Sequence, residues 1–461
     1  MSTRVICNEC VQKQEEIIRL REQLNRLKKK LRYQERTQKE GYFGSSTPSA
    51  KKPVKANTKI ENTKKNGGAK TGHPGAGRAS VAEDEAERIE TIDCQSQLCP
   101  HCQSPLEQMG HRNRSVLELE VPTTQKTIKR LQRMRCPACR KVFTAKAPGV
   151  LPKFLFSNQL LAHIASEHYL HNVPLGNLAN KLGLKIGAII EAMHHLAQRF
   201  QSIPPQLTEL YRQESLKHAD ETGWRNDGQN GYGWIFTSPS TTILRLRSTR
   251  SAQVVKETFG EKPLPGVLVV DRYAAYNSAP CQIQYCYAHL LRHVQDLEKE
   301  FPNNREITCF VETTAPLLAQ AMGLRTLPID KVTFEKKTKQ LKKNIIDVMN
   351  QEAKHPGIQK IQNIFRENHH RLYHWATSPQ IPAENNFAER QLRRLVIARK
   401  ICFGSQSKKG AQTREILMTV LLTLHKRNEG EVVKNLLNCL NKITLNQNLN
   451  PFSILFAENT S

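Results

Sequence analysis

The sequence lacks any apolar run of the roughly 18–20 residues that a membrane-spanning helix needs. No signal-peptide pattern follows Met1. Acidic residues are also scarce, because 42 Asp and Glu face 69 Lys and Arg, for a formal net charge of +27. An excess of this size favours a polyanionic partner, either nucleic acid or an anionic membrane surface. We therefore expect a soluble cytoplasmic protein that binds nucleic acid and has no membrane partner.

The twelve cysteines do not indicate a secreted, disulfide-linked protein, since several occur in C-x-x-C pairs that in a reducing compartment are typical of metal ligands. Two pairs, Cys99/Cys102 and Cys136/Cys139, are separated by 33 residues. Each pair bends the backbone so that two thiolates point at one tetrahedral ion. We predict a zinc-ribbon-like module with four cysteine ligands at residues 85–150 that holds one structural Zn²⁺.

The chain ahead of this module divides into a helix and a linker. Residues 1–40 contain an a/d seam of two heptads, which predicts a coiled coil and self-association; the seam consists of Ile17, Leu20, Leu24, Leu27 and Leu31. The alternative is an amphipathic helix that docks on its own protein. Residues 41–84 are rich in Ser, Pro, Gly and Lys, which predicts a disordered basic linker that contacts phosphates or serves as a solvated tether.

Residues 151–210 are expected to be helical. Ala179, Gly183 and Ile189 occupy relative positions 5, 9 and 15 of a possible helix-turn-helix, with Gly183 in the turn. That pattern predicts a DNA-binding region, although an ordinary helical hairpin has nearly the same sequence requirements. The alternatives remain open at this point.

The pattern changes at residues 211–301, where strand-like and helical segments alternate. "YGWIFTS" and "TTILRLRS" resemble strands, "SAQVVKETFG" resembles a helix, and Val267–Val270 is a continuous apolar strand. This order predicts a mixed α/β sheet. Mostly helical sequence follows at 302–380, then a basic helix within 381–430 and a C-terminal tail at 431–461.

Acidic residues stand where two of these strands are expected to end. Asp220 ends the first strand and Asp271 ends the strand Val267–Val270. Acids at the ends of neighbouring strands can converge on Mg²⁺, which prefers oxygen ligands, and two such ions support in-line phosphoryl transfer. Capping a turn is the alternative role for either aspartate alone. Glu221 is expected to point to the other face, because adjacent strand residues alternate sides.

A third carboxylate is expected from the late helix. Glu384 and Glu389 are the candidates, and five residues separate them, so they face about 140° apart around a helix. We assign Glu389, since Glu384 lies in the composition of a helix start, where an acid is favoured anyway. Residues 390–410 hold seven Lys or Arg and no acid, which suits a phosphate backbone. The predicted DNA-binding residues are Arg390, Arg393, Arg394, Arg399 and Lys400.

Four segments in series, "ADETGWR", "VVDRYAAY", "CYAHLLRH" and "ENNFAERQLRRLVIARK…GSQSKKGA", resemble insertion-sequence family sixty-six, the TnpC-type DDE transposases. The resemblance implies an RNase H-like catalytic domain with a helical insertion between the second Asp and the Glu. It also implies Mg²⁺ or Mn²⁺, as a pair of ions, bound by Asp220, Asp271 and Glu389. The chain departs from the family at Glu384, where the family usually has Asp before the paired Asn. Cys286 and His289 resemble the C-x-x-H signature of several DDE groups.

The expected function is therefore cleavage of a bacterial element at its terminal inverted repeats and transfer of the released 3′-OH to target DNA. The enzyme is expected to work at the nucleoid as a homo-oligomer, with element-encoded accessory proteins as possible partners. Two alternatives from other classes are a DNA-binding regulator that has lost catalysis and a structural-RNA-binding protein. All acidic positions are filled, which argues against the first, and the second has no use for the carboxylates.

Overall fold

The computed structural model describes residues 124–135, 142–144, 147–152, 154–427 and 430–456, together with residue 84 and seven residues between 16 and 24. The chain divides into two units, Met1–Leu119 and Glu120–Ser461. The seven residues near the N-terminus are helical, in line with the heptad spacing. The four cysteines of the predicted zinc module, Leu27, Leu31 and the linker up to residue 83 lie outside the described residues.

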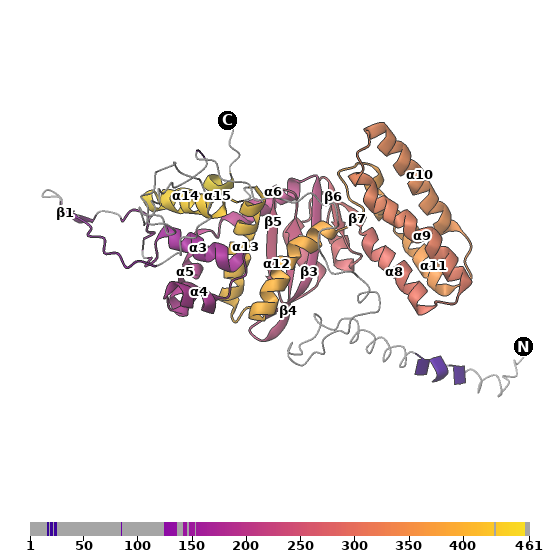
Figure 1. Cartoon of the computed structure of the whole chain (residues 1–461), viewed down its shortest axis with the longest axis horizontal. Helices are drawn as coiled ribbons and strands as arrows, with labels where there is room; N and C mark the ends of the chain where they lie inside the picture. Colours follow the sequence, from indigo (N-terminus) through magenta and orange to yellow (C-terminus); the bar gives the residue numbers. More distant parts are fainter. Residues whose placement is uncertain are drawn as a thin grey trace, which may run out of the picture. The chain divides into compact units, whose positions relative to one another are not determined.

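A five-stranded sheet forms the centre of the second unit, in the order β5-β4-β3-β6-β7 (Figure 1). Strands β3, β4 and β5 are antiparallel neighbours, whereas β6 runs parallel to β3 and β7 runs parallel to β6. The mixed α/β class predicted from the sequence is therefore present. The strands are β3 (Leu216–Asn226), β4 (Gln229–Thr237), β5 (Thr242–Arg247), β6 (Val267–Val270) and β7 (Gln282–Tyr285). A separate hairpin pairs β1 (Arg133–Arg135) with β2 (Val142–Thr144).

Strand β3 is longer than the sequence suggested, and the expectation that it ends at Asp220 is wrong. It continues to Asn226 because β4 pairs with it along its whole length, up to Asn226 opposite Gln229. A two-residue turn, Asp227–Gly228, closes the hairpin with positive φ at both positions. What ends near Asp220 is the pairing with β6, whose last partner is His218.

Helices cover both faces of the sheet. α12 (Asn386–Cys402) lies over β3 and β4 on one face. A Cβ on Gly233 of β4 would stand 2.4 Å from Leu395 Cδ2, so glycine at this position lets α12 approach the sheet closely. The opposite face, which carries Trp234 and Phe236, packs against α6 (Ile203–Gln213), α7 (Ala252–Phe259) and the 3-10 turn η2 (Ala274–Ser278). The buried core extends from the sheet into these layers.

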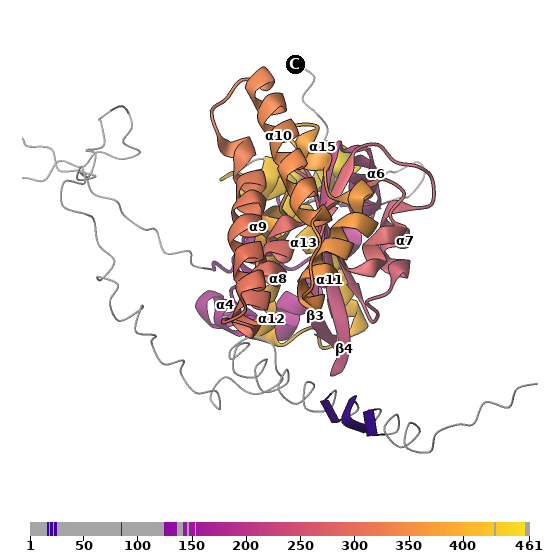
Figure 2. The same ribbon diagram turned by 90° about the vertical axis from the view of Figure 1, so that its right-hand side faces the viewer.

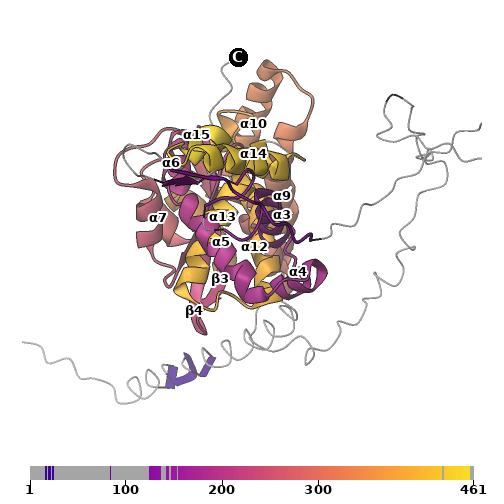
Figure 3. The same ribbon diagram turned by 90° about the vertical axis from the view of Figure 1, so that its left-hand side faces the viewer.

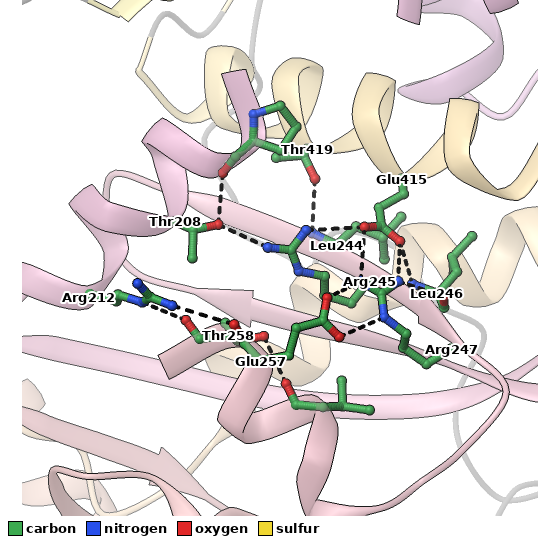
Figure 4. A network of polar contacts seen from close by, with 12 residues as sticks. Thr208, Arg212, Leu244, Arg245, Leu246, Arg247, Glu257, Thr258, Glu415 and Thr419 are labelled. Atoms are coloured by element: carbon green, nitrogen blue, oxygen red, sulfur yellow. Dashed lines mark hydrogen bonds and ion pairs between the residues drawn. The ribbon is translucent and has the colours of Figure 1, made fainter. Parts of the chain in front are cut away.

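The free edge of β5 is covered by α13 (Lys408–Arg427), whose side chains accept hydrogen bonds from the strand (Figure 4). The bonds run from Leu246 N to Glu415 Oε2, from Leu244 N to Thr419 Oγ1 and from Thr242 N to Thr423 Oγ1, at 2.9, 3.0 and 3.1 Å. Four helical residues rise about 6 Å and two strand residues about 6.6 Å, so the two spacings match. An edge satisfied in this way cannot pair with another strand.

A helical insertion lies beyond β7 (Figure 1), and its helices face the viewer in Figure 2. It comprises α8 (Tyr287–Glu300), α9 (Arg305–Gly323), α10 (Lys331–Asn350) and α11 (Pro356–Glu367), with short 3-10 turns. Residues Arg305–Thr326 have the length and hydropathy of a membrane-crossing helix. However, α9 packs on α8 and α10 within the insertion, as a core helix does.

The helices beyond β5 include the predicted helix-turn-helix segment (Figure 3). They are α3 (Asn158–Tyr169), α4 (Leu175–Leu182) and α5 (Ile186–Arg199). α4 ends at Gly183, which has a left-handed conformation with φ of 63°. The segment 431–461, expected as a tail, contains α14 (Val432–Leu445) and α15 (Pro451–Phe456). Asn158 Nδ2 of α3 donates to Asn441 Oδ1 and Thr444 Oγ1 of α14, so α14 is part of the folded unit.

Candidate active site

Two carboxylates stand at the same end of the neighbouring strands β3 and β6. The last pair of the parallel ladder joins His218 to Val269, and each aspartate lies two residues further on, Asp220 on β3 and Asp271 just after β6. Asp220 Oδ1 accepts a hydrogen bond from the backbone N–H of Glu221 at 2.9 Å. Asp271 Oδ1 accepts one from Tyr273 N at 2.9 Å, so it also caps its turn.

The environment of Asp220 disfavours its charge. Burial, together with the charges of Glu221, Asp271 and Glu389, raises the pKa of this carboxyl to about 8, against one backbone N–H that lowers it. Among the described residues, neither Asp220 nor Asp271 has an ion-pair partner. Ionisation of Asp220 at this end of the sheet therefore has no paired cation among the described residues, and a bound metal ion would supply one.

Of the two candidates for the third carboxylate, Glu389 is the one whose charge reaches Asp220. It lies in the first turn of α12, with 41% of its side chain exposed, and pairs with Arg292 Nη2 of α8 at 3.7 Å. Glu384 lies two residues before the helix. Its Oε2 is buried without a hydrogen-bond partner, and burial raises its pKa while Arg325 and Arg390 oppose the shift.

Asn385 anchors the start of α12 to the strand that carries Asp220. Its Oδ1 accepts from His218 Nδ1 at 2.9 Å, and its Nδ2 donates to Ala219 O at 2.8 Å. Its backbone N–H donates to the buried Cys286 Sγ at 3.1 Å. Burial lowers the pKa of His218 to about 4, which keeps this ring neutral. The positioning roles of Asn385 and His218 were not predicted, although the Asn pair after Glu384 was the available signal.

The two members of the C-x-x-H pair have different surroundings. Cys286 precedes α8 and holds Asn385, as above. His289 lies one turn into α8, with a buried Nδ1 that has no hydrogen-bond partner. Burial lowers the pKa of His289, and the charges of Asp271 and Glu389 oppose that shift. His289 is therefore part of the carboxylate neighbourhood, whereas Cys286 is part of its support.

Glu221 points away from Asp220, as strand alternation predicts. Its carboxylate accepts hydrogen bonds from Arg250 Nε at 2.8 Å and from the Tyr276 hydroxyl, and only 3% of its side chain is exposed. The guanidinium and the hydroxyl satisfy its charge on the face covered by η2. Glu221 is thus a structural acid next to a candidate ligand.

The predicted DNA-binding residues of α12 fall into two groups. Arg399 Nη1 donates to Thr222 Oγ1 at 2.9 Å and to Gly223 O at 2.7 Å, which ties α12 to β3. Arg394 Nη1 donates to Leu170 O at 3.3 Å and its Nη2 to His425 Nε2 at 2.9 Å. Both guanidiniums are half-buried in packing. The other three, Arg390, Arg393 and Lys400, are exposed.

The carboxylates offer the oxygen donors that Mg²⁺ prefers. Within the described part of the chain, no three His, Cys, Asp or Glu side chains lie close enough together to hold a metal ion. Two carboxylates at the same end of neighbouring strands, neither with an ion-pair partner among the described residues, nevertheless fit a hard cation. Because Mg²⁺ keeps several waters and is commonly bound through one or two carboxylates plus substrate phosphate, two strand-end aspartates suffice on the protein side.

A known protein family matches the chain. The model described as "Transposase IS66 family" matches residues 153–413, which is more than half of the chain. The matched segment contains all five strands of the central sheet, the insertion and the acidic residues of the candidate active site. A search of the curated proteins found no match.

Proposed function

The chain belongs to the IS66 family of transposases, and on that premise we propose that it cleaves DNA at the ends of a mobile element and joins the released ends to a target. The proposed catalytic domain has an RNase H-like fold. The sheet order β5-β4-β3-β6-β7, with three antiparallel strands followed by two parallel ones, supports this assignment.

The proposed catalytic residues are Asp220, Asp271 and Glu389. Asp220 and Asp271 would hold Mg²⁺ together with a DNA phosphate, and Glu389 would complete the set from α12. The bound metal would activate the attacking water or 3′-OH and stabilise the charge that develops on the phosphate. Because burial and neighbouring carboxylates raise the pKa of Asp220 to about 8, this carboxyl would give up a proton on binding a cation.

The exposed cations of α12 extend from the carboxylates and suit a phosphate backbone. Arg390, Arg393 and Lys400 would fix the DNA along the helix, whereas Arg394 and Arg399 hold the helix in place. The predicted zinc module, the α4–α5 pair and an oligomer would contribute to end recognition. The partner is double-stranded DNA in each case.

The observation that carries the proposal is the shared register of Asp220 and Asp271, with the charge of Glu389 beside them. The test uses a duplex from the sequenced flank of the gene, including its terminal inverted repeat. The protein should cleave this duplex with Mg²⁺ and not with EDTA. Asp271→Asn should abolish cleavage, while Asp227→Asn, in the exposed hairpin turn, should not.

Binding without cleavage under every divalent cation tested would contradict the proposal. It would favour the alternative of a DNA-binding regulator that has lost catalysis. If the protein is such a regulator, Asp271→Asn should also leave its DNA binding unchanged.

A further inference from the structure

Phe403 is the most exposed aromatic side chain among the described residues, with 74% of its surface accessible. It follows α12 directly as the C-cap and has φ of 59° and ψ of 4°. A non-glycine residue with a left-handed backbone is uncommon, and glycine or asparagine usually takes this position at a helix end. A large apolar group therefore stands in water on a strained residue, at a position where packing does not require it.

The turn that carries Phe403 is firmly held. Phe403 N donates to Arg399 O at 2.8 Å, and Ser405 N donates to Arg225 O at 2.9 Å. A Cβ on Gly404, which has φ of 128°, would meet Arg225 O at 2.2 Å, so the turn presses against the end of β3. Ser405 Oγ also accepts from Trp224 Nε1 at 3.1 Å. The exposed ring is consequently presented by an ordered support.

The sequence on both sides of Phe403 is basic and holds no acid from residue 390 to residue 414. An exposed stripe of α12 leads to it, made of residues that fall within about 100° of one another around the helix; they are Arg390, Arg393, Ile397, Lys400 and Ile401. Lys408 and Lys409 follow in the next turn of chain, and both are exposed. Cations interleaved with apolar groups suit a nucleic acid, because cations contact its phosphates and aromatic side chains stack on its bases.

We propose that Phe403 stacks on a base of the element-end DNA and unstacks it from its neighbour. The proposal rests on the proposed function, because it takes the DNA to lie along the α12 stripe. Glu389 directly precedes this stripe and Phe403 follows it, about 21 Å apart at 1.5 Å per helical residue. At 3.4 Å per base step, the affected base lies roughly six steps from the phosphate at the carboxylates.

In the experiment, each position of the end duplex is replaced in turn by 2-aminopurine. The fluorescence of this base rises when it unstacks. With wild-type protein the rise should occur five to seven steps from the cleaved phosphate, as the spacing of roughly six steps requires. Phe403→Asn should abolish it and weaken binding about tenfold, the loss expected for one base–aromatic stack. Phe403→Trp should keep the affinity. Val332→Ala on α10, where Val332 is 75% exposed, is the matched control and should change neither quantity.

Asparagine tolerates the left-handed backbone, so Phe403→Asn should melt at or above the wild-type temperature, and its loss of binding cannot then come from misfolding. Unchanged affinity and fluorescence in Phe403→Asn overturn the proposal. If light scattering instead shows that Phe403→Asn lowers the oligomeric state without changing these signals, Phe403 contacts a second copy of the chain. If wild-type protein neither binds nor cleaves the duplex, the proposed function fails as well.

Discussion

The adjacent acids Asp220 and Glu221 of β3 differ in whether a neighbouring group compensates their charge. Glu221 is buried against Arg250 and Tyr276, which satisfy its charge. Asp220 faces α12 with one backbone N–H as its hydrogen-bond donor and with other carboxylates nearby. The alternation of strand side chains thus separates an acid with a paired charge from one without an ion-pair partner at consecutive positions. Burying Asp220 without an ion-pair partner should lower the free energy of unfolding when this carboxyl is ionised.

The stability of the metal-free protein should depend on the protonation of Asp220. Its pKa is raised from 3.8 to about 8 in the folded protein. The native state keeps a proton that the unfolded chain releases, so this group's contribution to the free energy of unfolding falls as the pH rises through this window. Asp220→Asn has no such proton. Its stability relative to wild type should therefore increase from pH 5 to pH 8.5, on the order of 1–3 kcal/mol.

Thermal denaturation across this pH range without added Mg²⁺ checks the prediction. Asp227→Asn changes the same residue type in an exposed turn and should show a constant difference from wild type. A constant difference for Asp220→Asn would mean that its carboxyl ionises normally in the folded protein. Mg²⁺ should reduce the advantage of Asp220→Asn, because a cation favours the charged form of the wild-type side chain.

The place of Asp220 and Asp271 at one end of the sheet was predictable at the residue scale, because each acid interrupts or ends a run of strand-forming residues. Their role as metal ligands stays a prediction. Asn385 and Cys286 were not assigned supporting roles, since their hydrogen bonds join segments about 100 or more residues apart. The packing roles of Arg394 and Arg399 were missed for the same reason, because their hydrogen bonds also join distant segments. In sequence they resemble the other basic residues of α12, and only tertiary packing distinguishes a guanidinium that binds Thr222 from one that is exposed.

At the scale of elements, α13 and β5 show how a helix can satisfy the edge of a sheet. Glu415, Thr419 and Thr423 recur every four residues and accept from every second N–H of the strand. Glu415 also forms ion pairs with two arginines of β5 (Figure 4). Its Oε1 lies 3.1 Å from Arg245 Nη1, and its Oε2 lies 2.7 Å from Arg247 Nη1. Because α13 begins just after the turn of Phe403, this contact also fixes the end of the basic segment.

Removing one acceptor of this set should destabilise the protein. Thr419→Val keeps the shape of the side chain but leaves the buried Leu244 N–H without an acceptor. The expected loss is about 1–3 kcal/mol of the free energy of unfolding. Urea denaturation measures it, and Thr419→Ser, which keeps the hydroxyl, serves as the control. Equal losses for the two variants would show that the methyl group, and not the hydrogen bond, accounts for the effect.

Element types were largely predictable, because the strands around residues 232–247 and 267–285 and the helices of the insertion have strong local patterns. Two element-scale features were not. β3 continues through two acids and a glycine because β4 pairs with it, which local propensity does not show. The segment after residue 431 was expected as a tail, although α14 packs on α3 through Asn158 and Asn441.

At the scale of the whole molecule, the account predicts one zinc ion per chain, bound by Cys99, Cys102, Cys136 and Cys139. The strands β1 and β2 pair on either side of residues 136–141, which agrees with a hairpin at the second C-x-x-C pair. Four thiolates saturate one tetrahedral Zn²⁺. Elemental analysis of the purified full-length protein should give about one zinc per chain. Cys99→Ser with Cys136→Ser should lose it, whereas Cys309→Ser, at an exposed cysteine of α9, should keep it.

The central claim is that Asp220, Asp271 and Glu389 together carry out strand cleavage. The most direct measurement is the single-turnover cleavage rate of the end duplex with Mg²⁺, compared between Glu389→Gln and Glu384→Gln. Glu389→Gln should lower the rate by several orders of magnitude with end binding retained, as expected for loss of a metal ligand. Glu384→Gln should cleave at close to the wild-type rate, because Glu389 is the candidate whose charge acts on Asp220 and Oε2 of Glu384 already lacks a hydrogen-bond partner. Cleavage that survives Glu389→Gln and disappears in a folded Glu384→Gln protein would contradict the account.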